Sequence, residues 1–431
     1  MNTSVLLSGV CFLLSARDST AFAPPARTSS QVSFPGNRYS SATTGIWAAN
    51  EAINGDVLVS GLESKSSSGS DGDSVDLTAN NDDSSAATQQ QQSSNVDSSL
   101  QQTQKEGEEK PSFPLVLWRF TRPHTLIGSA LAIPSIFLLA APTYSSFFTL
   151  RALIALAYTA VPSLLMNLYI TGLNQITDVE IDKINKPYLP IAKGDLKKST
   201  AIGVVLVAVA ISLIMSVCNP VFGTSGLQVA LWGSFLLGTV YSLPPFRLKR
   251  HPLLAAFCIV AVRGTIINAG FYSHALSAAF SATREAAAGA GVVNCLLNDW
   301  KCALSSLFFG VFGIVIALMK DVPDAHGDRI FDIKSFTVRI GQKRVFRTMK
   351  NLLVLLFGVS GGALMQWAAL APTIGATTRR GLVGLGCILA GYFTNKEAKD
   401  VDAENSGEVY DYYMQLWKLF YLSYLALPLV K

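Results

Sequence analysis

The sequence has few charged residues. Of its 431 residues, 15% are Asp, Glu, Lys or Arg and 50% are hydrophobic, and the mean hydropathy is +0.35. A soluble globular domain carries about 25% charged residues, so this composition argues against an ordinary soluble enzyme. Six stretches of at least 18 residues contain no charged side chain, which is typical of membrane-spanning helices. These stretches are 123–150, 152–177, 200–246, 264–283, 302–319 and 351–378. The sequence therefore predicts a polytopic membrane protein.

The sequence also lacks the motifs of several enzyme classes. Its six cysteines form no CxxC pair, and we interpret them as small buried apolar residues. Its four histidines form no HExxH motif, and the chain has no GxxxxGK[ST] phosphate loop. These absences argue against a zinc enzyme and against a nucleotide-driven pump, and we expect no nucleic-acid partner.

Residues 1–50 are expected to form a two-part plastid-targeting leader. A short apolar stretch is followed by small residues, as in a cleavable signal peptide, and residues 26–50 are rich in Ser and Thr without any acid. The junction at 21–24 resembles the leaders of algae with plastids of secondary origin, in which Phe22 is read after cleavage. A plain secretory signal is the alternative interpretation.

Residues 51–110 contain no aromatic side chain and carry 12 acidic and 3 basic residues. Ser, Asp, Asn and Gln dominate this segment. Such a segment cannot bury enough apolar surface to offset the entropy of ordering, so we predict a disordered acidic linker.

Residues 111–431 are predicted to form an all-α membrane domain with about nine transmembrane helices in one bundle around a central cavity. The predicted helices are 123–141, 151–173, 200–217, 226–243, 252–271, 303–320, 350–370, 381–395 and 412–430, of which Arg263 and Lys418 interrupt two. Basic residues concentrate in the connections after the second, fourth and sixth helices. The positive-inside rule places these three connections on one face, together with the N-terminal end of the domain.

Two acidic clusters follow uncharged stretches on that face. Asn174, Asp178 and Asp182 are spaced i, i+4 and i+8, so a continuous helix would place them on one side. The second cluster is spaced i, i+3 and i+7, and it shares one side if the helix continues past Pro323, which can kink it. Its members are Asp321, Asp324 and Asp328.

Acids this close together cannot all remain ionised without a cation between them. Oxygen ligands beside Lys and Arg suit Mg²⁺ that holds a phosphate group. The alternative interpretation is that these acids cap helices or pair with neighbouring lysines. Because two clusters of three each follow an uncharged stretch, we favour the functional interpretation.

Four motifs, in order, resemble those of the UbiA-type intramembrane prenyltransferases. Residues 174–182 resemble the NxxxDxxxD motif of that family, and residues 320–328 resemble its second motif, DxxDxxxD. Residues 122–125 resemble the entry motif of the first helix, and residues 241–250 resemble the loop after the fourth helix. The resemblance covers about residues 113–431.

The resemblance implies a Mg²⁺-dependent transfer of a prenyl group from a prenyl diphosphate to an aromatic ring. Tyr241 would stabilise the allylic cation through its ring face, and the apolar bundle would exclude water and hold the prenyl tail. The carboxylates expected to hold Mg²⁺ are Asp178, Asp182, Asp321, Asp324 and Asp328. The residues expected to bind substrate are Asn174, Arg122, Lys186, Lys249, Arg250 and Arg263.

Within the family, residues 185–190, 331–336, 341–346 and 417–421 are similar to the plastid homogentisate prenyltransferases. That branch attaches a phytyl or a solanesyl chain to homogentisate with loss of CO₂, in tocopherol and plastoquinone biosynthesis, in a plastid membrane. Residues 334–346 favour phytyl, whereas residues 190–196 favour solanesyl. We favour phytyl, and a solanesyltransferase or another aromatic or chlorophyllide prenyltransferase is the alternative.

Arg263 interrupts an apolar stretch, where a lone cation costs about 3 kcal/mol on insertion scales. We expect it to face the bundle interior and to find an anionic partner, either an aspartate of the two clusters or a negative group of the substrate. The alternative is that the helix ends early and Arg263 reaches the surface.

An ion-coupled transporter is the remote alternative to an enzyme. A transporter would place its acids near the middle of helices, with little charge in the loops. This chain places them at the ends of apolar stretches beside basic loops, which favours the enzyme.

Overall fold

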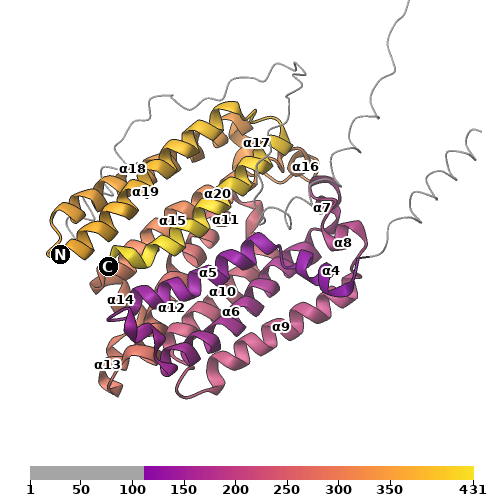
Figure 1. The fold of residues 1–431 in the computed structure, drawn as a ribbon. Helices are drawn as coiled ribbons and strands as arrows, with labels where there is room; N and C mark the ends of the chain where they lie inside the picture. Colours follow the sequence, from indigo (N-terminus) through magenta and orange to yellow (C-terminus); the bar gives the residue numbers. More distant parts are fainter. Residues whose placement is uncertain (1–110) are drawn as a thin grey trace, which may run out of the picture. The chain divides into compact units, whose positions relative to one another are not determined.

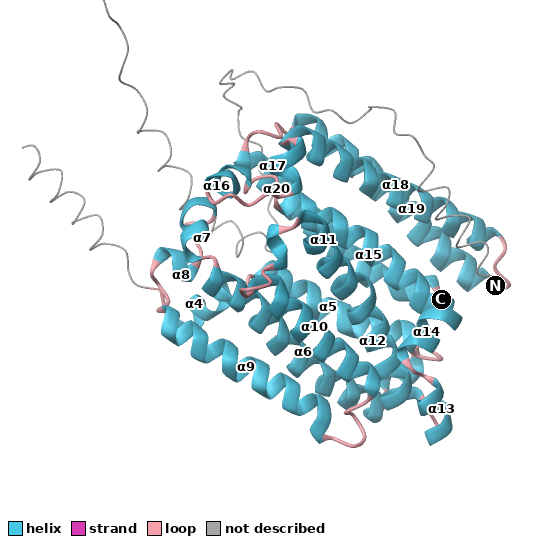
Figure 2. Ribbon diagram, turned by 180° about the vertical axis from the view of Figure 1, so that it is seen from behind, coloured by secondary structure: helices cyan, strands magenta, loops and turns pink. Residues whose placement is uncertain are grey.

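The computed structural model describes residues 111–431 (Figures 1 and 2). The leader and the linker predicted for residues 1–110 lie outside the described residues. Within residues 111–431 every regular element is a helix and no strand is present, which confirms the all-α prediction.

Each of the nine predicted apolar stretches corresponds to a long helical segment of this part of the chain. The fifth segment, Pro252–Phe280, is one continuous run of α-helix with two π-helical turns, η3 (Ala261–Ile266) and η4 (Ala275–Phe280). Its α-helical parts are α11 (Pro252–Val260) and α12 (Ile267–His274). The other long helices are α5 (Pro123–Ala140), α6 (Leu150–Thr177), α9 (Lys198–Cys218), α10 (Ser225–Ser242), α15 (Trp300–Lys320), α18 (Gln342–Ala369), α19 (Ile374–Glu397) and α20 (Ser406–Ala426).

Six of these nine segments are long and apolar enough to cross a membrane, which supports a multi-pass membrane protein. They are α5, α6, α9, Pro252–Phe280, α15 and α18. The remaining three, α10, α19 and α20, are 18 to 24 residues long but more polar. Arg379 and Arg380 lie in α19, for example, and Lys418 lies in α20. Nine long helical segments are therefore present in residues 111–431, and nine membrane spans remain a prediction.

The short helices of the site lie at one end of the long ones. Figure 1 shows α4, α7, α8, α16 and α17 at the end opposite to α13 (Arg284–Gly289) and α14 (Val292–Asn298). The first group comprises α4 (Phe113–Phe120), α7 (Val179–Asn185), α8 (Pro190–Lys193), α16 (Ala325–Ile330) and α17 (Phe336–Ile340). The three basic connections thus lie at the same end as the N-terminal helix α4, as the charge pattern predicts.

The core of the helix array is centred on α15. In its most apolar 18 residues 61% are buried, compared with 28–44% in the other five apolar segments. Phe309 and Phe312 of α15 are fully buried and pack against Phe420 of α20. In contrast, α18 and α19 pack along each other at the edge of the array (Figures 1 and 2). Many large apolar side chains of the outer helices, such as Leu206 and Phe257, are exposed, as expected for surfaces that face lipid.

Candidate active site

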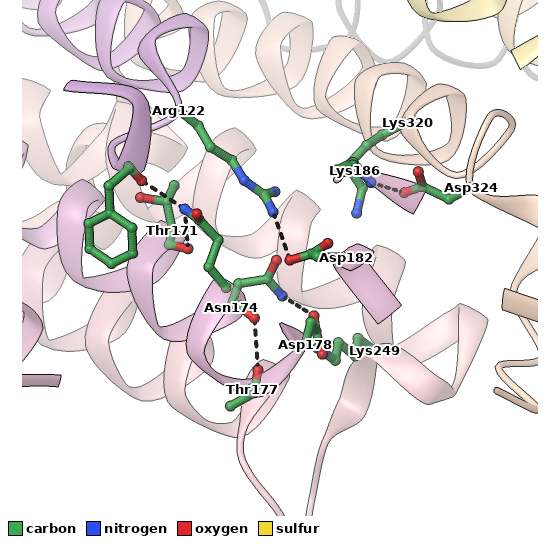
Figure 3. Close-up of polar contacts among 12 residues, drawn as sticks. Arg122, Thr171, Asn174, Thr177, Asp178, Asp182, Lys186, Lys249, Lys320 and Asp324 are labelled. Atoms are coloured by element: carbon green, nitrogen blue, oxygen red, sulfur yellow. Dashed lines mark hydrogen bonds and ion pairs between the residues drawn. The ribbon is translucent and has the colours of Figure 1, made fainter. Parts of the chain in front are cut away.

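The first acidic cluster lies where α6 ends. The helix ends at Thr177, and Asp178 adopts non-helical angles (φ −115°, ψ 17°) before α7 begins at Val179. A continuous helix through the cluster, which the spacing assumes, is therefore wrong. Aspartate favours such helix ends because its side chain competes for backbone hydrogen bonds. Asn174 still donates a hydrogen bond of 3.0 Å from Nδ2 to Asp178 Oδ2 (Figure 3).

Two cations from the loop after α10 hold Asp178. Arg247 Nη2 donates to Asp178 Oδ1 at 2.9 Å, and Lys249 Nζ contacts Asp178 Oδ2. Burial lowers the pKa of Lys249 to about 8, and the charge of Asp178 opposes this shift. Asp178 is 8% exposed, so the ion pairs form in a largely desolvated place. The loop after α10 therefore closes over the end of α6.

Asp182 lies on α7 and faces Arg122. Arg122 Nη2 is 4.0 Å from Asp182 Oδ2, and that oxygen is buried without a hydrogen-bond partner in the described chain (Figure 3). Burial raises the pKa of Asp182 to about 6, with further contributions from the charges of Asp178 and Asp324. The carboxylate of Asp182 is thus buried near other acids, and the charges of Arg122 and Lys186 offset the effect of burial on its pKa only in part.

The second acidic cluster follows the end of α15. This helix ends at Lys320, residues 321–324 form a turn that contains Pro323, and α16 begins at Ala325. The helix does not continue past Pro323, because proline lacks the N–H that the next turn needs. The cluster is therefore carried by a turn and a short helix. Asp321 pairs with Lys320 at 3.2 Å, and burial raises the pKa of Asp321.

Asp328 lies on α16 and is 7% exposed. Burial raises its pKa to about 7, and the charges of Asp321 and Asp324 act in the same direction. Ser335 hydrogen-bonds to Asp328 and partly opposes the shift. Like Asp182, Asp328 is a buried carboxylate beside other carboxylates.

Two contacts join the acidic clusters. Lys186, just after α7, pairs with Asp324 of the second cluster (Figure 3). The preceding residue, Asn185, accepts a hydrogen bond of 3.1 Å through Oδ1 from the backbone N–H of Gly327 on α16. A Cβ atom at position 327 would lie 2.1 Å from Asn185 Oδ1, so only glycine permits this approach. The two loops, about 140 residues apart in the sequence, are thereby held side by side.

Tyr241 and Arg250, both predicted site residues, lie in different surroundings. Tyr241 lies in the last turn of α10, near enough to both clusters for the charges of Asp178, Lys320 and Asp321 to act on its hydroxyl group. Arg250 is exposed, and no ion pair involves it in residues 111–431. It lines a pocket of about 290 Å³ together with Asp178, Glu180 and Arg247, so it lies beside the first cluster without pairing with an acid there.

Arg263 faces the bundle interior, as predicted, but not an aspartate. Its guanidinium carbon lies 5.3 Å from the ring centroid of Trp417 and 5.8 Å from that of Phe420, both buried on α20. Within residues 111–431 it makes no ion pair. An aspartate partner is therefore wrong, because ring faces attract the cation instead. The alternative prediction, that the helix ends near Arg263, is also wrong, because the helical segment continues to Phe280.

Sequence reasoning missed three residues of the site: Arg247, Lys320 and Asn185. All three lie inside motifs that the sequence made visible, but their partners depend on tertiary contacts. Two arginines of the site have strained backbones: Arg122 and Arg247 both adopt left-handed angles (φ 51° and 38°). Such strain in non-glycine residues is often found at functional sites.

The donor set of the two clusters fits Mg²⁺. The ligands are carboxylate oxygens, and burial, with a smaller contribution from the charges of neighbouring acids, raises the pKa values of Asp182 and Asp328. In residues 111–431 no three acid, His or Cys side chains converge closely enough to form a metal site alone. Mg²⁺ commonly binds through one or two carboxylates plus substrate phosphates, so this arrangement is compatible with it.

Comparison with known proteins gives one family and several relatives. A model of the UbiA prenyltransferase family matches residues 123–419. The chain is 39% identical over 316 residues to homogentisate phytyltransferase 1, chloroplastic, of Arabidopsis thaliana, covering 73% of this chain and 75% of that protein. It is 35% identical to homogentisate geranylgeranyltransferase of Hordeum vulgare, covering 73% and 72%. It is 32% identical to homogentisate solanesyltransferase, chloroplastic, of Arabidopsis thaliana, covering 73% and 76%.

Proposed function

The chain belongs to the UbiA prenyltransferase family and is a prenyltransferase, and from this we propose that it transfers a prenyl group from a prenyl diphosphate to the ring of homogentisate. The observation that carries the proposal is the pair of acidic loops joined at one end of the bundle through Lys186 and Asp324. Relatives at 32–39% identity support the acceptor, because their names share homogentisate although their donors differ.

The charge balance of the site supports a diphosphate held with metal. Five cations and five carboxylates belong to the two clusters and their partners. The cations are Arg122, Lys186, Arg247, Lys249 and Lys320, each in contact with an acid. A bound diphosphate adds negative charge that this balanced set does not offset, so we propose that Asp178, Asp182, Asp321, Asp324 and Asp328 hold Mg²⁺. Bound Mg²⁺ would supply Lewis-acid stabilisation to the leaving diphosphate.

The protein's own residues position and protect the reacting carbon. Arg122 and Lys249 would contribute to the binding of the diphosphate, and Asn174 keeps Asp178 in place. The ring of Tyr241, near both clusters, would face the allylic cation that forms when the C–O bond breaks. Apolar helices around the site exclude the water that would otherwise trap this cation.

We infer that phytyl diphosphate is the preferred donor and that the protein works in a plastid membrane. The relative named as a phytyltransferase is more similar to this chain than those named for geranylgeranyl and solanesyl transfer. Two of these three relatives are named chloroplastic, and the six apolar helices suit a membrane position.

A parallel assay tests the proposal. The purified protein would be given homogentisate, Mg²⁺ and phytyl, geranylgeranyl or solanesyl diphosphate, and the products would be identified by mass. We expect a prenylated, decarboxylated product with the highest kcat/KM for phytyl diphosphate, and no product in EDTA. No prenylated homogentisate with any donor would overturn the proposal, and a preference for solanesyl diphosphate would assign the other donor.

A further inference from the structure

Arg263 is a cation at depth in the helix bundle. It lies eleven residues after the start of the Pro252–Phe280 segment, and the Cβ of an alanine at Gly313 on α15 would lie 3.4 Å from Arg263 Cβ. Trp417 and Phe420, whose rings its guanidinium faces, are 1% and 0% exposed. Arg263 itself is only partly buried, so some of its surface remains accessible.

The backbone around Arg263 is built to hold it in one place. It lies in the π-helical turn η3, and π-helical turns inside α-helices are frequent at functional sites. The amide of Asn268, which is fully buried, donates hydrogen bonds to the carbonyl oxygens of Arg263 and Gly264. Tyr424 of α20 donates in turn to Asn268 Oδ1 at 3.3 Å. The π-helical turn is therefore fixed to α20.

The charge of Arg263 is attracted by rings but not neutralised. No carboxylate pairs with it in the described part of the chain, whereas the five cations of the acidic clusters all contact acids. Aromatic faces stabilise a guanidinium. The N–H groups, which lie in the plane of the guanidinium, can still bind an anion. A cation at this depth is costly unless an anion joins it during function.

The guanidinium lies on the interior side of the acidic loops. Gly313, beside Arg263, precedes Asp321 by eight residues of α15, about 12 Å at 1.5 Å per residue. Helical side chains lean toward the helix N-terminus, and Pro252 at that N-terminus lies at the acidic end, so Arg263 leans toward the clusters. The ring of His124, two residues after Arg122, lies 5.2 Å from the ring of Trp417.

We propose that Arg263 binds the carboxylate of the acceptor and thereby selects aromatic acids as acceptors. This inference rests on the proposed function. The diphosphate is the polar end of an apolar donor and belongs at the acidic loops, where five cations lie. The acceptor ring must lie beside the carbon that carries the diphosphate. Within residues 111–431, Arg263 then offers the acceptor's carboxylate a cation on the interior side that has no ion pair. His124, two residues after Arg122, contacts the ring of Trp417, which faces Arg263. Aromatic rings thus connect the two positions, which suits an aromatic acceptor.

The test compares a charged acceptor with a neutral acceptor of the same size. Wild type, Arg263→Gln and Arg263→Lys would be assayed with homogentisate and with its primary amide, each against a range of prenyl diphosphate concentrations. We expect Arg263→Gln to raise the KM for homogentisate by roughly 10- to 100-fold, the range for loss of a charged hydrogen bond. The KM for the amide and the KM for the donor should change little. Arg263→Lys should recover part of the loss, because an ammonium lacks the planar fork.

Lys418→Gln is the matched control, because it removes an exposed cation beside Trp417 on the outer side of α20. It should leave the ratio of the two acceptors unchanged. An equal loss for both acceptors in Arg263→Gln would assign a structural role to Arg263, and a rise in the donor KM alone would assign it to the diphosphate. Either result overturns the inference, as do unchanged kinetics. If the Gln variant does not accumulate, the same acceptor ratio in Arg263→Lys decides. Failure of the wild type to prenylate homogentisate would instead contradict the proposed function.

Discussion

At the scale of single residues, each carboxylate of the first cluster is held by cations from a different segment of the chain. Arg247 and Lys249 come from the loop after α10, and Arg122 comes from the start of α5. Desolvation makes such pairs expensive to break on one side only, because the remaining charge is left buried without a partner. The positions of these cations therefore determine where a diphosphate and its metal ions can bind.

The two arginines of the loop after α10 make a matched pair for testing this arrangement. Arg247→Gln removes an ion pair to Asp178 and should lower kcat/KM for the prenyl diphosphate by at least ~10-fold, the effect of losing a charged hydrogen bond. Arg250→Gln removes an exposed cation and should cause a smaller loss. Steady-state kinetics with both variants measure the difference. Equal losses would show that the exposed position matters as much as the contact with Asp178.

Substitutions of Tyr241 test whether its ring face or its hydroxyl group takes part in the reaction. If its ring face stabilises the allylic cation, Tyr241→Phe keeps that face and should retain most of the kcat. Tyr241→Leu should lower kcat by about 10-fold, since a desolvated cation–π contact is worth up to about 2 kcal/mol. Single-turnover measurements with a saturating donor separate this effect from binding. A larger loss in the Phe variant than in the Leu variant would instead assign the role to the hydroxyl group.

At the scale of elements, the contact between α7 and α16 aligns the two acidic loops. Gly327→Ala would place a methyl group 2.1 Å from Asn185 Oδ1 and so push the loops apart. Displacement of catalytic groups by about 1 Å can cost on the order of 100-fold in rate, so kcat should fall by that order. Gly358→Ala on α18 is the control, because a methyl group there meets nothing within 4 Å. It should leave kcat unchanged, and a similar loss in both variants would refute the role of the α7–α16 contact.

The helices could be predicted from the sequence, but the contacts of the site only in part. Apolar stretches located all nine long helical segments of residues 111–431, because apolar composition and helix length are local properties. The pairing of Arg247 with Asp178 spans 69 residues and depends on how the loop after α10 folds back. The contacts of Arg263 could not be predicted for a different reason. The charge pattern predicted that Arg263 faces the interior. Its aromatic partners were not predicted, because only anionic groups were expected to pair with a cation.

The ends of the acidic helices illustrate the same limit. Spacing alone treats Asn174, Asp178 and Asp182 as one helical face, but the chain leaves the helix at Asp178 and starts again at Val179. The side chain of Asp competes for hydrogen bonds of the helix backbone, and from the sequence this predicts only a preference of Asp for helix ends. The outcome of this competition depends on the cations that reach the side chain from other elements.

At the scale of the whole molecule, the basic connections gathered at one end predict the orientation in the membrane. The positive-inside rule places this end, with the active site, on the stromal side of a plastid membrane. Lys334→Cys and Gly291→Cys would test this in isolated plastid membranes with a membrane-impermeant thiol reagent. Each would be made in a Cys218→Ser background, because Cys218 is exposed. We expect labelling at position 334 from the stromal side and at position 291 only after the membrane is opened. The reverse pattern would contradict the orientation.

The leader makes a separate prediction about the whole protein. Residues 1–50 fused to a fluorescent protein should direct it into the plastid of an alga with a secondary plastid. Phe22→Ala should leave the fusion outside, because the residue after signal cleavage is changed. Equal import of both fusions, seen by fluorescence microscopy, would contradict the two-part leader.

We propose that the two acidic loops form one metal and diphosphate site, and a double-mutant cycle in kcat tests this proposal. Asp178→Ala and Asp321→Ala would be measured singly and together with homogentisate and a saturating prenyl diphosphate, with Glu180→Ala as an exposed acidic control. Each single change should lower kcat by at least ~100-fold, the penalty for losing one strong electrostatic stabiliser. The double variant should be little worse than either single one, because groups that act as a unit are not additive. Near-normal turnover in either single variant, or losses that multiply in the double variant, would contradict a shared site.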